Sequence, residues 1–114
     1  METQAIQELM EGKLNPLEAA IRLDREIGGI TRVKWNPGAR QYKVFNHTAE
    51  VQLPARGANN REYKKLEDCA AMAYLIAQEH GNYKAGEVHI SHTFSTRHHQ
   101  FREQALALRA HYSN

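Results

Sequence analysis

Residues 31–45 decide the fold of this chain, and they read TRVKWNPGARQYKVF. Apolar and polar side chains alternate with a period of two on both sides of Asn36-Pro37-Gly38, which has the composition of a turn. One face of the two segments would be apolar: Val33, Trp35, Tyr42 and Val44. The other face would carry polar and basic side chains: Arg32, Lys34, Gln41 and Lys43. The stretch therefore predicts two antiparallel strands, within residues 30–35 and 40–45, that separate an apolar face from a basic one.

A third strand is expected directly after these two. Its apolar residues are in phase with one another but out of phase with the preceding strand: Ala49, Val51 and Leu53. A slip of one residue moves side chains to the opposite face of a sheet. We therefore expect a turn or bulge near Asn46-His47, between the second and third strands. A loop from Pro54 to Asn60 would follow.

Two helices are predicted before the sheet. Residues 3–11 form a short amphipathic helix, because their apolar side chains recur at helical spacing: Ile6, Leu9 and Met10. A second helix begins at Asn15-Pro16-Leu17-Glu18, where Asn15 is a good N-cap, Pro16 fits the first helical position and Glu18 completes a capping box. Gly28-Gly29 ends it. The first helix would pack on the domain, and pairing with its copy in a homodimer is the alternative.

Helical and extended patterns alternate again after the sheet. The longest helix runs from Glu62 to His80, and its small residues would let it lie close to a sheet: Cys69, Ala70, Ala71, Ala73 and Ala77. Residues 87–94 predict a fourth strand, with one face made of Val88, Ile90, His92 and Phe94. Ser95 or Thr96 would cap a last helix, whose apolar face would hold Phe101, Ala105, Leu108 and Tyr112.

These elements predict an α+β protein with an antiparallel sheet of three to four strands packed on an Ala-rich helix. The expected order is α-α-β-β-β-α-β-α. A chain of 114 residues is large enough for one core, so we expect a single domain over residues 1–114. Its parts would be a helical pair in 1–28, a basic three-stranded sheet with its helix in 30–80, and a strand and C-terminal helix in 87–112.

Basic residues are concentrated in one part of the sequence. Residues 22–65 hold ten Lys and Arg against four Asp and Glu, a net charge of +6, whereas the whole chain carries +2. Such a concentration often presents a face to phosphate. The candidate contacts come from the strands, the turn, the loop and the helix start: Arg32, Lys34, Arg40, Gln41, Lys43, Arg56, Arg61, Lys64 and Lys65. A merely solvated basic face, or a surface for an acidic protein, stays open as an alternative.

Lys64 and Lys65 stand in the first turn of the predicted helix, where cations oppose the helix dipole. A phosphate docked at that helix end would reverse the sign of this effect. The pair is therefore interpreted as a phosphate clamp beside the basic sheet face.

Residues 29–86 resemble the AP2-type module of phage HNH endonucleases and plant transcription factors. The resemblance rests on three strands, then Leu66-Glu67-Asp68-Cys69-Ala70-Ala71-Met72-Ala73-Tyr74, then His80-Gly81-Asn82-Tyr83-Lys84-Ala85. It implies a sheet that lies in the major groove of DNA, where Arg and Lys pair with guanine and Gln with adenine. The readers would be Arg32, Lys34, Arg40, Gln41 and Lys43.

Two further resemblances compete for the same residues. The α-β-β-β-α order of residues 15–80, with Lys64-Lys65 before an Ala-rich stretch, resembles double-stranded-RNA-binding domains. That family recognises shape and phosphates across minor grooves. Residues 11–23 resemble the first helices of helix-turn-helix domains. All three resemblances imply a nucleic-acid partner, and we expect DNA rather than RNA.

No catalytic motif is found in the sequence, which lacks a P-loop, a Gly-x-Ser-x-Gly elbow and paired catalytic carboxylates. Four histidines lie within eleven residues: His89, His92, His98 and His99. On a strand the first two would point to opposite faces, and the last two diverge on a helix, so they do not form a metal site. We expect no enzyme activity, no cofactor and no metal.

The single cysteine, Cys69, excludes an internal disulfide framework and is expected to be a small buried helical residue. The longest apolar run, Ala70 to Ala77, is far below the ~20 residues needed to span a bilayer. The N-terminus starts with polar, acidic residues, so no secretory signal is expected. The expected compartment is the reducing cytoplasm, without a membrane partner.

The function that follows is a small non-enzymatic nucleic-acid-binding protein, an accessory or regulatory factor of the phage or plasmid kind. It would contact DNA through the basic sheet face. The alternative is a protein-interaction module, such as a phage-type inhibitor that docks on a nucleic-acid-processing complex. That module would use its basic face on an acidic groove, or its acidic segments as a mimic of nucleic acid.

Overall fold

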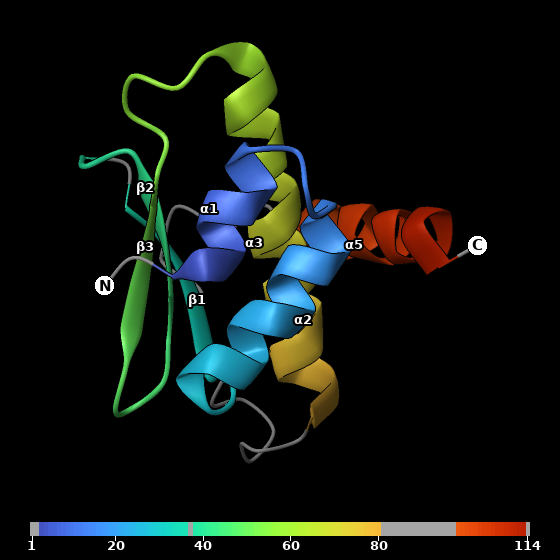
Figure 1. Cartoon of the computed structure of the whole chain (residues 1–114). Helices are drawn as coiled ribbons and strands as arrows, with labels where there is room; N and C mark the ends of the chain where they lie inside the picture. The colour runs from blue at the N-terminus through green and yellow to red at the C-terminus, as the bar shows by residue number, and fades with distance from the viewer. Residues whose placement is uncertain (1–2, 37, 81–97, 114) are drawn as a thin grey trace.

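A three-stranded antiparallel sheet forms one layer of the protein, and helices form the other (Figure 1). The computed structural model describes residues 3–36, 38–80 and 98–113. Its elements follow the chain in this order: α1 Gln4–Met10, α2 Pro16–Ile27, β1 Arg32–Asn36, β2 Gln41–Phe45, β3 Glu50–Pro54, α3 Asn60–His80 and α5 His98–Ser113. The α+β class and this order confirm the prediction, except for the strand expected at 87–94 and its neighbouring cap, which lie outside the described residues.

The strands pair in the order β1-β2-β3, as two consecutive hairpins. Val33 faces Val44 across the first pair, and Val44 faces Val51 across the second, so one valine row crosses the whole sheet. Trp35, Tyr42 and Leu53 form the next row on the same face. The period-two alternation of residues 31–45 therefore predicted the strands and the face that each side chain takes.

The phase change between the second and third strands is a four-residue turn at Asn46 to Ala49. The Asn46 N–H donates to the Ala49 carbonyl (2.9 Å), and the Asn46 Oδ1 accepts from the N–H groups of Thr48 and Ala49 (both 2.8 Å). The Asn46 Nδ2 donates to the carbonyls of Ile27 (2.6 Å) and Gly29 (2.9 Å). One buried amide thus closes the hairpin and ties it to the end of α2, and the predicted turn is confirmed.

The ends of α2 follow their local sequence signals. Asn15 is the N-cap, its Oδ1 accepting from the Glu18 N–H (2.8 Å) while the Glu18 Oε1 accepts from the Asn15 N–H (3.0 Å). Pro16 occupies the first helical turn. Gly28 has φ 81°, the left-handed conformation that ends many helices. The Asp24 Oδ1 then accepts from the Ile30 N–H (2.7 Å) and directs the chain into the sheet.

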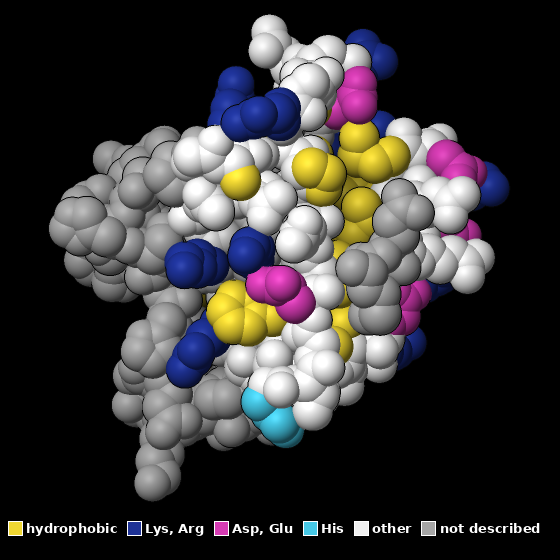
Figure 2. Space-filling view, turned by 90° about the vertical axis from the view of Figure 1, so that its left-hand side faces the viewer, with side chains coloured by type: hydrophobic (Ala, Val, Ile, Leu, Met, Phe, Trp, Pro, Cys, Tyr) yellow, Lys and Arg dark blue, Asp and Glu magenta, His cyan; other side chains and the backbone are white. Residues whose placement is uncertain are grey.

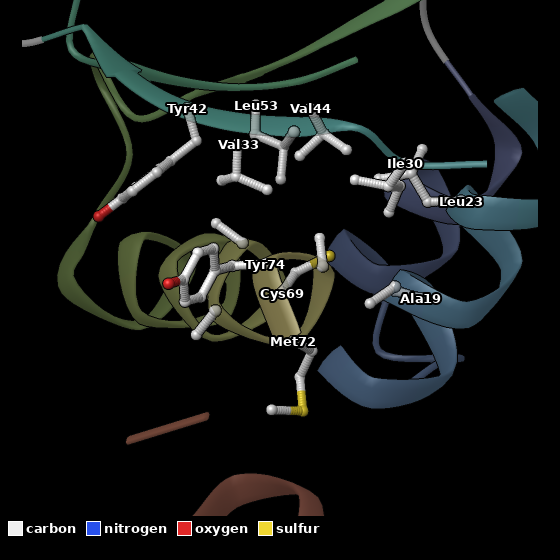
Figure 3. Packing of buried hydrophobic residues seen from close by; sticks show 14 of the residues in the cluster. Ala19, Leu23, Ile30, Val33, Tyr42, Val44, Leu53, Cys69, Met72 and Tyr74 are labelled. Atoms are coloured by element: carbon white, nitrogen blue, oxygen red, sulfur yellow. The ribbon is translucent and has the colours of Figure 1, made fainter. Parts of the chain in front are cut away.

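The core lies between the sheet and α3, with α2 at its side (Figure 3). Val33, Val44 and Leu53 point from the sheet toward Cys69 and Tyr74 of α3. The helix is rich in alanine on this side, so its backbone lies close to the strands, and Cys69, Ala70 and Ala73 have no exposed surface. Helix α5 packs on the far side of α3, where Ala105 is fully buried.

Several element boundaries differ from expectation by one or two residues. Helix α3 starts at Asn60 rather than Glu62, because Asn59 acts as its N-cap and its Oδ1 accepts from the Glu62 N–H (2.8 Å). Strand β3 includes Pro54, which was expected in the loop. Helix α1 packs on α2 through its buried Ala5 and Leu9, as the preferred intramolecular arrangement predicts.

Candidate functional site

One face of the sheet carries no described helix, and we call it the open face. It presents the alternate residues of the three strands: Arg32, Lys34, Asn36, Gln41, Lys43, Phe45, Glu50, Gln52 and Pro54. Figure 2 looks onto this side of the molecule and shows Lys and Arg side chains around a hydrophobic patch and an acidic side chain. The face therefore combines cations, amides, one aromatic ring and one carboxylate.

Cations stand next to one another on the open face. Lys34 and Lys43 are directly opposed across β1 and β2, and Lys43 in turn faces Gln52 on β3. Like charges in this position destabilise a sheet. The Lys43 Nζ lies 3.5 Å from the Glu50 Oε1, which offsets part of the repulsion. Arg32 and Lys34 are exposed and form no ion pair with any residue in the described part of the chain.

The turn between β1 and β2 lies beside the loop between β3 and α3, and we call this the loop end of the sheet. The Arg40 carbonyl accepts from the Ala55 N–H (2.7 Å), and the Arg56 Nη2 donates to the Gly38 carbonyl (3.0 Å). Arg61 is exposed in the first turn of α3. Two of the predicted contacts, Arg40 and Arg56, therefore come from the two connections at one end of the sheet, and Arg61 follows them at the start of α3.

Arg40 has φ 47°, in the left-handed region that non-glycine residues rarely adopt. Its guanidinium carbon lies 5.8 Å from the centre of the Tyr63 ring, within the range of a cation–π contact. The backbone is thus held in an unfavourable conformation while the side chain is placed over an aromatic ring of α3.

Tyr63 belongs to an aromatic cluster that closes the loop end of the core. The centre of the Trp35 ring lies 4.5 Å from the centre of the Tyr42 ring and 6.5 Å from that of the Tyr63 ring. The Tyr42 hydroxyl lies 3.4 Å from the Tyr63 hydroxyl and donates to the Glu67 Oε2 (3.3 Å). Burial raises the pKa of Tyr42 far above its ordinary value, so the hydroxyl stays neutral and keeps donating.

Lys64 and Lys65 lie on the helix side of the molecule. The Lys64 Nζ is 2.8 Å from the Oδ1 of Asp68, one turn further along α3, and the hydrogen bond to Asp68 raises the pKa of Lys64. Gln104 of α5 also donates to this buried carboxylate (3.0 Å). Arg61, Lys64 and Lys65 line a cavity of about 440 Å³ beside the connection from α1 to α2. The predicted clamp thus faces that connection, and Lys64 already has an internal anion. Because α3 starts at Asn60, both lysines stand in its second turn, so the prediction that they oppose the dipole from the first turn is wrong.

The nine predicted contacts therefore fall into three places. Four lie on the open face: Arg32, Lys34, Gln41 and Lys43. Two lie at the loop end, Arg40 and Arg56, and Arg61 joins this end to the helix side of Lys64 and Lys65. The structure adds residues that the sequence did not single out, namely Phe45 and Gln52 on the open face and Tyr63 beneath Arg40. For Tyr63 the available signal was an aromatic side chain in the first turn of the longest helix.

The histidines considered for metal binding lie outside what the structure describes: residues 89 and 92 are not described, nor are the side chains of residues 98 and 99. Within the described ranges, no three His, Cys, Asp or Glu side chains come close enough to share a metal ion. None of the described helices combines the length and the apolar character needed to cross a membrane. Cys69 is fully buried, and burial raises the pKa of its thiol to about 12.

Comparisons with models of protein families, with curated proteins and with solved structures gave no match for this chain. The candidate site therefore stands on its own geometry.

Proposed function

We propose that this chain is a small nucleic-acid-binding protein of the accessory or regulatory kind, which acts in the cytoplasm and holds phosphates on the open face of its sheet. The observation that carries this proposal is the pair of opposed lysines, Lys34 and Lys43, on a face without a described cover. The repulsion between the two ammonium groups destabilises the protein when no ligand is bound. A phosphate placed between them would attract both groups and remove this destabilisation. Arg32 extends the same charge along β1.

The use of charge elsewhere in the molecule supports this reading. Glu8 pairs with Arg22, Asp68 with Lys64 and Glu79 with Arg109, so three acidic side chains of the helices have cationic partners within the chain. A surface intended to mimic nucleic acid would leave its carboxylates without such partners. Arg32 and Lys34 form no ion pair with a described residue, and their positive charge favours an anionic partner.

The AP2-type and double-stranded-RNA-binding resemblances place the contact on different surfaces. The first would use the open face, whereas the second would use Lys64-Lys65 at the start of α3. The open face has the more available charge, because Asp68 already binds Lys64. We therefore assign the main contact to the open face and keep Arg40 and Arg56 as its flank.

The test is fluorescence anisotropy with labelled DNA and RNA, as duplexes and as single strands, at 50 and 200 mM salt. The variant Lys34→Gln/Lys43→Gln should weaken binding by at least about tenfold at the lower salt concentration. It should also reduce the slope of log affinity against log salt concentration by about one to two, because each lysine that neutralises a phosphate releases a counterion.

Two matched variants remove the same charge from other surfaces. Lys13→Gln/Arg109→Gln acts on one ion pair of the α1–α2 connection and one between α3 and α5. Arg61→Gln/Lys65→Gln acts on the helix side of the candidate site. The first should leave affinity and salt dependence almost unchanged. If the second weakens binding more than Lys34→Gln/Lys43→Gln does, the contact lies at the start of α3 and the assignment to the open face is wrong.

An inhibitor that docks on a nucleic-acid-processing complex would use the same cations against an acidic protein groove. Copurification of such a complex that survives nuclease treatment, together with no binding to any oligonucleotide at 50 mM salt, would favour that function. Loss of the copurifying protein after nuclease treatment would favour direct binding of nucleic acid.

A further inference from the structure

Phe45 is an aromatic residue on the open face, where the core gives it no role. Its neighbour Val44 is fully buried on the opposite face, whereas Phe45 is partly exposed and lies outside the hydrophobic core cluster. The backbone at this position is fixed, because the Phe45 carbonyl accepts from both the N–H (3.0 Å) and the hydroxyl (2.8 Å) of Thr31. These hydrogen bonds fix the backbone from which the ring projects, on the face that also carries the cations.

Two cations and one carboxylate neighbour this ring in the register of the sheet. Glu50 is its direct partner on β3, and the Lys43 Nζ, 3.5 Å from the Glu50 Oε1, offsets that negative charge. Arg32 is the direct cross-strand partner of Phe45 on β1, and Lys43 precedes it by two residues on the same face. Such neighbours lie about 5 Å apart across strands and about 7 Å apart along a strand. Lys34 stands on the diagonal, opposite Lys43. An aromatic ring with cations at these separations can contact a base and the phosphates on either side of it.

Three amide side chains also lie on the open face, which they share with Glu50 and Pro54. The Gln41 Nε2 donates to the Gln52 Oε1 across β2 and β3 (3.4 Å), and both side chains keep further donors and acceptors. Asn36 is the cross-strand partner of Gln41. Amides of this kind can form hydrogen bonds with the exposed edges of an unpaired base.

From these contacts we infer that the open face binds single-stranded nucleic acid, with an unpaired base stacked on Phe45 and the flanking phosphates held by Arg32, Lys34 and Lys43. The inference rests on the proposed function and narrows it to one class of ligand. In a duplex the faces of the bases are stacked on each other, so a surface phenylalanine gains nothing there. In a single strand each base has a free face, and stacking on an aromatic side chain strengthens binding regardless of sequence.

The experiment compares three ligands and three proteins by fluorescence anisotropy at 50 mM salt. The ligands are a labelled 12-nucleotide oligothymidine, the same backbone without bases, and a 12-base-pair duplex. The proteins are the unchanged chain, Phe45→Leu and Phe45→Tyr. Leucine preserves the bulk and hydrophobicity of the side chain but removes the aromatic face, whereas tyrosine retains that face.

The unchanged chain should bind the oligothymidine at least about tenfold more tightly than the duplex. Phe45→Leu should lose about 5- to 100-fold in affinity for the oligothymidine and nothing for the abasic strand or the duplex, and Phe45→Tyr should keep its affinity for all three. Circular dichroism checks that both variants are folded. The effect on a single ligand also separates lost stacking from misfolding, which would weaken all three.

Equal or tighter binding of the duplex, or the same loss with Phe45→Leu on the abasic strand, would overturn the inference and leave the proposed function in place. In that case Lys34→Gln/Lys43→Gln would still weaken binding. If no nucleic acid binds at 50 mM salt, both the proposed function and the inference fail.

Discussion

The two faces of the sheet are built from alternate residues of the same three strands, yet they have opposite properties. On the covered face Val33, Val44 and Leu53 have no exposed surface and pack against α3. On the open face Arg32, Lys34 and Gln52 are exposed and no described helix covers them. The comparison teaches that stability and binding are separated by the period of the strand. Side chains one position apart can therefore be changed to affect one property and leave the other.

The largest expected difference between the two faces is the rate at which a thiol on each face reacts with iodoacetamide. Cys69 lies under the covered face and has no contact with solvent. Its burial raises the pKa of the thiol to about 12, so the thiol is protonated at pH 8. Its reaction with iodoacetamide should be slower than that of the unfolded chain on the order of a thousandfold or more, since the core must open first.

The matched control is Gln52→Cys in a Cys69→Ala background, which places the only thiol on the open face. This thiol should react at nearly the rate of a free cysteine. Mass spectrometry measures the modified fraction of each protein over time. Rapid modification of Cys69 in the unchanged chain would show that the covered face is not closed.

Leu53 and Gln52 test the comparison within a single strand. Leu53→Ala should lower the free energy of unfolding by about 2–5 kcal/mol, because it removes buried methyl groups and leaves a cavity between the sheet and α3. Gln52→Ala should change it by no more than about 0.5 kcal/mol, since this side chain is exposed. Urea denaturation measures both values, and similar losses would contradict the separation of the faces.

Arg40 lies at the loop end, where the two faces meet, and its backbone can be tested apart from its side chain. Arg40→Ala and Arg40→Gly remove the same cation and the same contact with Tyr63. Only glycine adopts φ 47° without strain, so the glycine variant should be the more stable of the two by about 1 kcal/mol. Both should weaken nucleic-acid binding to the same extent. Equal stability would mean that the turn relaxes when the side chain is removed.

The smallest expected effect on stability comes from the opposed lysines. Lys34→Glu converts a like-charged cross-strand pair into an oppositely charged one and should raise the free energy of unfolding by about 0.5 kcal/mol. The same change should reduce nucleic-acid binding more than Lys34→Gln does, because it adds repulsion of phosphate. A loss of stability in Lys34→Glu, measured by its urea midpoint, would contradict the repulsion assigned to this pair.

Local signals were sufficient for most of the fold. The alternation in residues 31–45 predicted which side chains are buried, and the phase change before Val51 located the turn at Asn46. The capping box of Asn15 and Glu18 predicted the start of α2. Each of these signals depends on neighbours within four residues, so one sequence is enough to detect them.

The candidate site depends on contacts that the sequence does not show. The register puts Lys34 opposite Lys43 and Glu50 within reach of Lys43, and it brings Phe45 beside Arg32. Register is set by turn lengths and by packing against the helices, and alternation alone leaves it open. The contact of Gln104 with Asp68 joins residues 36 positions apart, which no local pattern predicts.

The ion pair between Lys64 and Asp68 does have a local signal in the sequence. Lys64 and Asp68 stand four residues apart on a helix, the spacing at which opposite charges pair. This spacing argues against Lys64 as half of a phosphate clamp, because Asp68 already pairs with its charge. Lys65 has Cys69 at the same spacing and forms no ion pair with a described residue, so its charge stays available on the helix side.

The Asn46 amide has a consequence for the order in which the protein assembles. Its Oδ1 bonds are local and can form as soon as the turn closes, on the microsecond scale of a hairpin. Its Nδ2 bonds require the carbonyls of Ile27 and Gly29, and thus the end of α2. The hairpin would then present a preformed docking point for the helix, and the last turn of α2 and the tip of the hairpin would exchange their amide protons as one cooperative unit.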